Sequence, residues 1–239
     1  MNDLLARAVA THGGLEGFNR FKTVCAHLAI GGALWLLKGQ AGALSKVQVT
    51  VELDQERVSF ASFKLPSQRA VFTPQRVAVE TNEGAVVAER ASPRAAFAGH
   101  GRETPWDDLH LMYFGGYAMW TYLTVPFSLT WAGFEAREIE PWQEQGETWR
   151  RLKVTFPPSI ASHSSEQTFS FGDDGLLHRH DYVDEVAGNF PVAHYVSAYK
   201  DVSGLLIPTK RRAFARQPDN TPALEALTVS IDLSDMRCA

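Results

Sequence analysis

The sequence has 239 residues, of which 45% are hydrophobic and 21% are charged, a balance typical of a folded globular protein that excludes extensive disorder. Its formal net charge is -4 and its Lys and Arg residues are scattered, which excludes the basic surface that nucleic-acid binding needs. The two cysteines, Cys25 and Cys238, are too few for a disulfide framework or a cysteine metal site. No linker-like segment divides the chain, so we expect a single domain over residues 1–239.

The N-terminal segment, residues 2–22, predicts short helices. Apolar residues recur at helical spacing from Leu4 to Val9. Asp3 and Arg7 interrupt any continuous apolar run, so the segment lacks the pattern of a secretory signal. The sequence therefore predicts a cytoplasmic protein.

A first β-meander is expected over residues 24–90. Residues 24–37 are apolar around Gly31-Gly32, which indicates a strand with a bulge or a tight bend. From Val47 to Leu53 apolar and polar residues alternate, as in a half-buried antiparallel strand. Short strand-like segments joined by polar turns then follow one another, which is typical of a meander.

The segment from Leu109 to Phe134 contains no Asp, Glu, Lys or Arg. Thr104 suits a helix N-cap and Pro105 the first helical position, while Pro126 cannot continue a helix, so we predict a helix over about residues 105–122. About twenty apolar residues suffice to span a bilayer. However, the glycines within this segment and the acidic sequence before it are atypical of a span. We expect a buried helix in a soluble protein, with no integral membrane span.

Strand signals resume after this helix and indicate a second meander over residues 148–234. The segment Gly172-Asp173-Asp174-Gly175 is typical of a hairpin turn between two of its strands. Two meanders that flank one apolar helix predict an α+β fold. We expect a strongly curved antiparallel sheet, or incomplete β-barrel, of about ten strands wrapped around that helix and preceded by the short N-terminal helices.

Polar-tipped aromatic residues recur on one face of the predicted helix. Their spacings are four, three, four and three residues: Trp106, His110, Tyr113, Tyr117 and Trp120. As the floor of a pocket, this face would place His110, oriented by Asp107, as a general acid or base, with the Tyr117 hydroxyl positioning a substrate oxygen. Alternatively, these side chains fill the core and make hydrogen bonds to the backbone.

A second polar group alternates along a predicted strand and so projects from one face: His178, His180, Tyr182 and Asp184. Asp184 lies too far from His180 along an extended strand to share a metal ion, so a metal site would need a ligand such as His163 or His194. We expect a solvated polar face and no metal site. No nucleotide-binding, zinc-protease or hydrolase motif occurs, and we predict no cofactor.

The segment YVSAYKDVSGLLIPTKRR, from Tyr195 to Arg212, combines Tyr-x-x-x-Tyr, a Gly-centred turn and Pro208 on the next strand. Together with the order of helices and meanders, it resembles the lipoprotein carriers of LolA/LolB type. The resemblance implies an incomplete antiparallel barrel that wraps helices and leaves a hydrophobic cavity for acyl chains or other apolar ligands.

Three functional classes follow from these patterns. The first is binding of a hydrophobic small molecule or lipid in the cavity, by Trp106, His110, Tyr113, Tyr117, Trp120 and His194. The alternative is a cofactor-independent enzyme, such as a cyclase, isomerase or hydrolase, that uses His110, Asp107 and Tyr117 on an apolar substrate. The third is an interaction module without a ligand. A cavity on the order of several hundred Å³ would favour the first two classes over the third.

Overall fold

The computed structural model describes residues 2–239. The strands are β1 Thr23–Gly31, β2 Val47–Glu52, β3 Val58–Ala61, β4 Gln68–Thr73, β5 Arg76–Thr81, β6 Val86–Ala91, β7 Glu135–Glu144, β8 Glu147–Thr155, β9 Glu166–Phe171, β10 Leu177–Asp184, β11 Phe190–Val202, β12 Leu205–Arg216 and β13 Pro222–Cys238. The helices are α1 Asp3–Thr11, α2 Gly14–Asn19, α3 Ala33–Leu37 and α4 Asp108–Thr124, with short 3-10 turns η1 Pro93–Phe97, η2 Phe127–Thr130 and η3 Glu185–Ala187.

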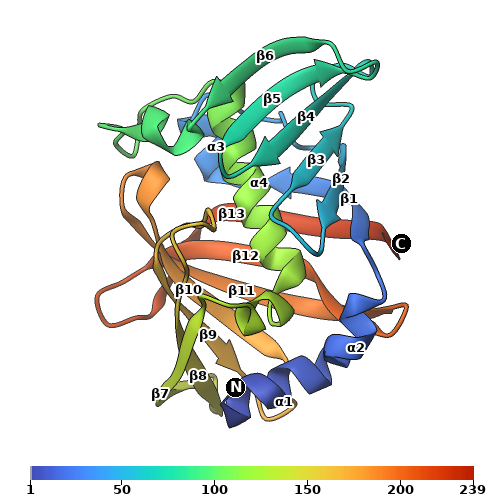
Figure 1. Cartoon of the computed structure of the whole chain (residues 1–239). Helices are drawn as coiled ribbons and strands as arrows, with labels where there is room; N and C mark the ends of the chain where they lie inside the picture. The colour runs from blue at the N-terminus through green and yellow to red at the C-terminus, as the bar shows by residue number, and fades with distance from the viewer. Residues whose placement is uncertain (1) are drawn as a thin grey trace.

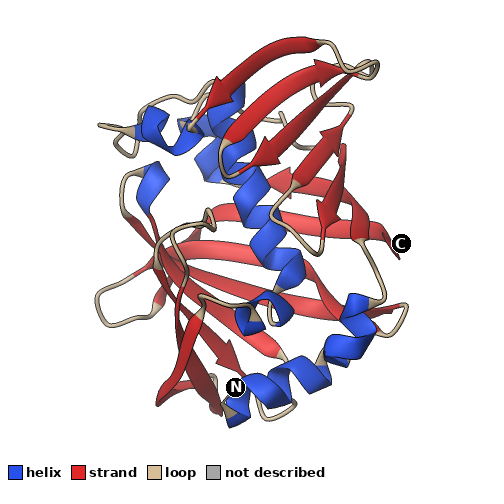
Figure 2. Cartoon of the chain, in the orientation of Figure 1, coloured by secondary structure: helices blue, strands red, loops and turns tan. Residues whose placement is uncertain are grey.

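All of these strands form one antiparallel sheet in the order β6-β5-β4-β3-β2-β1-β13-β12-β11-β10-β9-β8-β7. The two meanders meet where β1 pairs with β13, with Leu28 opposite Leu233 and Ile30 opposite Ile231. The sheet is open, because β6 and β7 lie at its two ends. Figures 1 and 2 show α4 lying across the two halves of the sheet, with α1 and α2 beside the second half.

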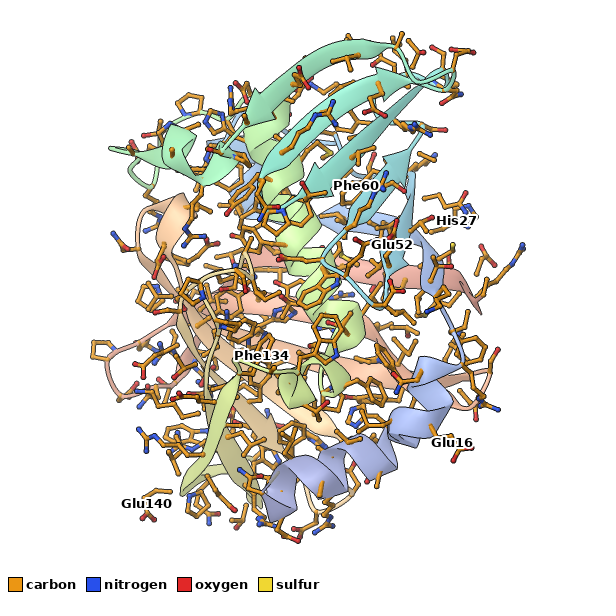
Figure 3. The ribbon with its side chains drawn as sticks, viewed as in Figure 1. Glu16, His27, Glu52, Phe60, Phe134 and Glu140 are labelled. Carbon is orange, nitrogen blue, oxygen red and sulfur yellow. The ribbon has the colours of Figure 1, made fainter. Side chains whose placement is uncertain are left out.

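Helix α4 is buried along almost its whole length, from Leu109 to Thr124, with His110 as the exception. It packs on β2 to β6, and its C-terminal part reaches β12, where Arg211 Nη2 donates to the carbonyl of Tyr122 at 2.6 Å. Side chains fill the space between the helix and the sheet, among them Phe60 of β3 (Figure 3). Burial on every side explains why the segment carries no charged residue beyond its first turn.

The fold corrects part of the sequence prediction. The α+β class and the antiparallel pairing are confirmed, but the sheet has thirteen strands rather than about ten, and it is not strongly curled. The second meander begins at Glu135, earlier than the predicted residue 148, because β7 is an exposed edge strand in which charged residues obscure the alternation. None of the helices in residues 2–239 has the length and apolarity needed to cross a bilayer.

Helix α4 starts later than predicted. Asp107, not Thr104, is its N-cap, because the Asp107 carboxylate accepts a hydrogen bond from the backbone N–H of His110 at 2.9 Å. The Thr104 hydroxyl instead accepts from the backbone N–H of Gly101 at 2.9 Å, within the preceding loop. The helix also continues two residues past the predicted end, to Thr124.

The predicted strand over residues 24–37 is two elements. Strand β1 ends at Gly31, and the chain turns through Gly32 into the short helix α3. Gly32 has φ +111°, and a side chain there would overlap the backbone of Thr228 on β13, so the turn depends on glycine. The Trp35 indole N–H donates to the carbonyl of Gly31 at 2.9 Å and fixes α3 against the end of β1.

Candidate functional site

A narrow cavity, which we call the apolar slot, lies between α3, α4 and strands β10 to β13. Its volume is about 90 Å³. Its walls are mostly aliphatic and aromatic: Ile30, Ala33, Leu34, Trp35, Leu37, Leu44, Phe114, Gly115, Ala118, Met119, Ala187, Phe190, Val192, Ala213, Ala226, Val229 and Ile231. The polar residues in the walls are Arg102, Tyr122, Tyr182, Asp184 and Thr228. Arg102 and Ala226 are exposed, so the slot opens to the surface between them.

The polar part of the slot joins a buried hydrogen-bond network. The Tyr122 hydroxyl lies 2.9 Å from His163 Nε2 and 3.2 Å from the Tyr182 hydroxyl. The Tyr182 hydroxyl is in turn 3.4 Å from His194 Nδ1. On the far side of His163, Nδ1 lies 3.3 Å from the Tyr117 hydroxyl. Three elements and a loop thus bring one hydroxyl-imidazole chain to the wall of the slot.

Asp184 is the one carboxylate in the wall of the slot. It is 4% exposed, and its Oδ1 has no hydrogen-bond partner within residues 2–239. The nearest imidazole atom, His163 Nδ1, is 3.8 Å away, beyond hydrogen-bond reach. An acceptor buried without a donor is costly, which makes Asp184 a candidate for contact with a ligand.

Burial keeps the hydroxyls of this network neutral, together with the imidazole of His194 and that of His180 beside it. It raises the pKa of Tyr117, Tyr122 and Tyr182 above the usual value for tyrosine. Burial also lowers the pKa of His180 and His194 well below 6.5, and the positive charge of Arg211 adds to this effect. The three tyrosine hydroxyls and the His194 imidazole therefore offer hydrogen bonds to a ligand rather than a titrating base at neutral pH.

Arg211 is a buried cation beside the network. Burial lowers its pKa to about 10, while the surrounding tyrosines oppose the shift. Its guanidinium lies 4.5 Å from the centre of the Tyr122 ring. The cation-π contact and the hydrogen bond to the Tyr122 carbonyl hold the C-terminal part of α4 in place.

His110 lies outside the slot, at the N-terminus of α4. Its Nδ1 is 2.7 Å from an Asp107 carboxylate oxygen and 3.3 Å from the Asp107 backbone nitrogen, and its Nε2 is 3.2 Å from the carbonyl of Ala96. The arrangement is a capping box, in which the side chain serves the helix end. A catalytic role for His110, Asp107 and Tyr117 stays a prediction, and the structure places only Tyr117 in the buried network.

The other predicted ligand-binding residues are spread around α4. Trp106 packs against Phe114, with ring centres 5.0 Å apart, and Trp120 donates to the carbonyl of Gln55 at 2.9 Å. Tyr113 lines a different, polar cleft. Tyr117 and His194 belong to the network behind the slot, and none of these residues is part of its wall. Their direct contact with a ligand stays a prediction.

The polar cleft lies on another side of α4 and has a volume of about 560 Å³. Arg94 crosses it, donating to the carbonyl of Ser162 at 2.9 Å and pairing with Glu185. Because its cation and carboxylate are already paired with each other, the cleft presents no unsatisfied charge of the kind found in the slot.

The prediction that the polar residues of β10 form a solvated face is wrong. His180, Tyr182 and Asp184 are 1%, 5% and 4% exposed, because β10 lies inside the sheet and α4 covers this face. His178 is separated from them by an irregularity in the pairing with β9 and lies near the Asp174 turn. Residues 2–239 contain no group of three or more His, Cys, Asp or Glu placed to hold a metal ion.

Sequence reasoning missed Tyr122 and the role of His163. Tyr122 lies on a helix that is buried all round, where spacing does not single out one functional face. His163 comes from the loop between β8 and β9, and its contacts with Tyr122 and Tyr182 depend on tertiary structure. The alternation that aligned Tyr182 with Asp184 was the one usable signal.

No protein-family model matches the sequence, and no curated protein matches it either. Solved structures do match over nearly the whole chain. A DUF1329 family protein from Desulfovibrio piger is 12% identical with a TM-score of 0.56, covering 98% of this chain and 91% of its own. A LolA superfamily protein from Nitrosomonas europaea is 7% identical with a TM-score of 0.55, covering 98% and 92%. The chain therefore has a LolA-like fold, which confirms the resemblance found in the sequence at the level of fold.

Proposed function

We propose that the protein binds a slender hydrophobic small molecule, such as one with a single alkyl chain, in the apolar slot. The observation that carries this proposal is an apolar cavity that opens to the surface at Arg102 and Ala226. Apolar cavities with a few polar groups are the usual form of a small-molecule site. The LolA-like fold supports the same conclusion, because the resemblance to LolA/LolB-type carriers implies a cavity for acyl chains.

The size of the slot defines the kind of ligand. Its volume of about 90 Å³ is smaller than the ~300–1,000 Å³ of sites for drug-sized molecules, and it falls below the several hundred Å³ that we took to favour a ligand site over an interaction module. The proposal therefore rests on the apolar walls of the slot and on its opening, and not on its volume. Gly115, Ala118 and Ala213 leave a narrow passage between α4 and the sheet, where larger side chains would close it. The ligand is therefore a chain rather than a bulky ring system.

A bulky side chain placed at the opening of the slot tests the proposal. Ala226 is exposed and lines the slot, so Ala226→Trp would cover the opening without disturbing the core. Glu225→Trp is the matched control, because Glu225 is also exposed but is not part of the wall of the slot. Binding of 1-decanol, decanoate and methyl decanoate is measured by native mass spectrometry and by fluorescence titration.

We expect at least one of these chains to bind the wild type and the Glu225→Trp protein equally well. The Ala226→Trp protein should bind it at least about tenfold more weakly, because each 1.4 kcal/mol of lost contact is a factor of ten. Unfolding temperatures of the three proteins should agree within a few degrees. Unchanged binding in the Ala226→Trp protein would place the ligand elsewhere.

A further inference from the structure

The wall of the apolar slot is not uniform. Most of it is hydrocarbon, but Tyr122, Tyr182 and Asp184 form one polar patch within it. An alkyl chain makes no use of such a patch, and a buried polar group without a partner costs free energy. The chemistry of the patch therefore indicates which head group the ligand has, whereas the apolar walls of the slot indicate only its chain.

The groups in the patch differ in how well they are satisfied. The Tyr122 and Tyr182 hydroxyls contact each other at 3.2 Å and each contacts an imidazole, so both have partners within the protein. Asp184 is different, since its Oδ1 is buried and has no donor in the described part of the chain. The unmet requirement in the patch is a hydrogen-bond donor for a carboxylate.

The cations near Asp184 do not meet this requirement. No Lys or Arg nitrogen of residues 2–239 lies within 4.0 Å of its carboxylate oxygens, where only His163 Nδ1 is found at 3.8 Å. Lys38 is buried nearby, but its ammonium group donates to the carbonyl of Gly101 at 3.0 Å and lies 5.0 Å from the Trp106 ring centre. Arg102 stacks on Phe190 at 4.8 Å and is exposed to water.

We propose that the polar patch selects a ligand whose head group is an uncharged hydrogen-bond donor, a hydroxyl at the end of an alkyl chain, and that Asp184 is the residue that accepts its hydrogen bond. A hydroxyl also accepts, so the tyrosine hydroxyls remain compatible with it. A carboxylate head would bring a second negative charge to a desolvated site, and an ester would bring only acceptors. This inference rests on the proposed function of the slot.

The test compares three ligands with the same chain and different heads: 1-decanol, methyl decanoate and decanoate. In the wild type we expect 1-decanol to bind at least about tenfold more tightly than either of the others, the size of effect a hydrogen bond to a charged group gives. This ranking requires no variant, so it can be measured even if substitutions at the patch disturb folding.

The variant Asp184→Asn then shows whether Asp184 causes the preference for 1-decanol. We expect it to bind decanoate more tightly and 1-decanol more weakly than the wild type, so that the preference largely disappears. Asp54→Asn, which changes an exposed carboxylate outside the slot, should keep the wild-type ranking. Unfolding by urea, measured in parallel, confirms that each variant is folded under the binding conditions.

The outcomes separate the two proposals. Equal binding of the three ligands to the wild type, or a preference for 1-decanol that survives in Asp184→Asn, would overturn the role of Asp184 and leave the proposed function intact. A failure of all three ligands to bind the wild type would overturn the proposed function itself, and the head-group inference with it.

Discussion

We expect individual buried residues to make the stability of this protein depend on pH. His180 is 1% exposed, and burial lowers its pKa well below the ordinary value of 6.5. Between 6.5 and the lowered native pKa, the unfolded chain binds a proton that the folded chain does not, so stability is full above about pH 6.5 and is lost as the pH falls. The loss reaches at most about 1.4 kcal/mol per pH unit for one histidine.

The variant His180→Gln isolates this effect. Glutamine retains a donor for the Gln167 side-chain oxygen, which lies 2.6 Å from His180 Nε2, but it does not titrate. We expect the stability of the wild type relative to this variant to decrease between pH 7 and pH 5, measured by urea unfolding. Phe60→Leu, at a buried ring on β3 in the other half of the sheet, is the control and should shift stability equally at both pH values. A constant difference for His180→Gln would contradict the account.

At the scale of elements, the contact between α4 and β4 is close enough to exclude a methyl group. A Cβ atom at Gly116 would overlap the ring of Phe72, whereas one at Gly115 would meet Phe60 at an ordinary distance of 3.5 Å. We therefore expect Gly116→Ala to destabilise the fold by about 1–3 kcal/mol or more through overpacking.

Gly115→Ala is the matched control for this contact, since it adds the same methyl group one residue earlier. Alanine favours a helix by up to ~1 kcal/mol over glycine, so this variant should be neutral or more stable. Free energies of unfolding measured by urea denaturation check both variants. Equal effects of the two substitutions would show that α4 does not approach β4 as closely as the structure has it.

Elements were predictable from the sequence where the signal is local. The alternation from Val47 to Leu53 and the charge-free segment after Leu109 identified a strand and the central helix correctly. The start of α4 was displaced because Thr104 and Asp107 are both acceptable N-caps, and only tertiary contacts decide between them. The exposure of the polar face of β10 was predicted wrongly, because that face is buried by α4 and the sequence of β10 alone does not reveal this contact.

At the scale of the whole molecule, the sheet depends on pairing between the two strands that lie farthest apart in the sequence, β1 and β13. β1 and β13 join the two meanders, and no local pattern predicts that pairing. The polar patch and its neighbour His163 likewise depend on contacts between segments that are distant in the sequence. Tyr122 lies on a helix, His163 in a loop and Asp184 on a strand. The sequence therefore indicated the class of fold, but it did not locate the residues that line the slot.

We propose that an alkyl chain occupies the apolar slot, and photo-crosslinking shows where such a chain binds. A decyl alcohol with a diazirine at the far end of its chain is irradiated with the protein, and the labelled residues are identified by peptide mass spectrometry. We predict labels on slot residues of α3 and α4, such as Leu34 and Met119, and competition by excess 1-decanol. Labels confined to exposed apolar residues such as Val86 and Val87, with none in the slot, would show that the chain binds the surface and not the slot.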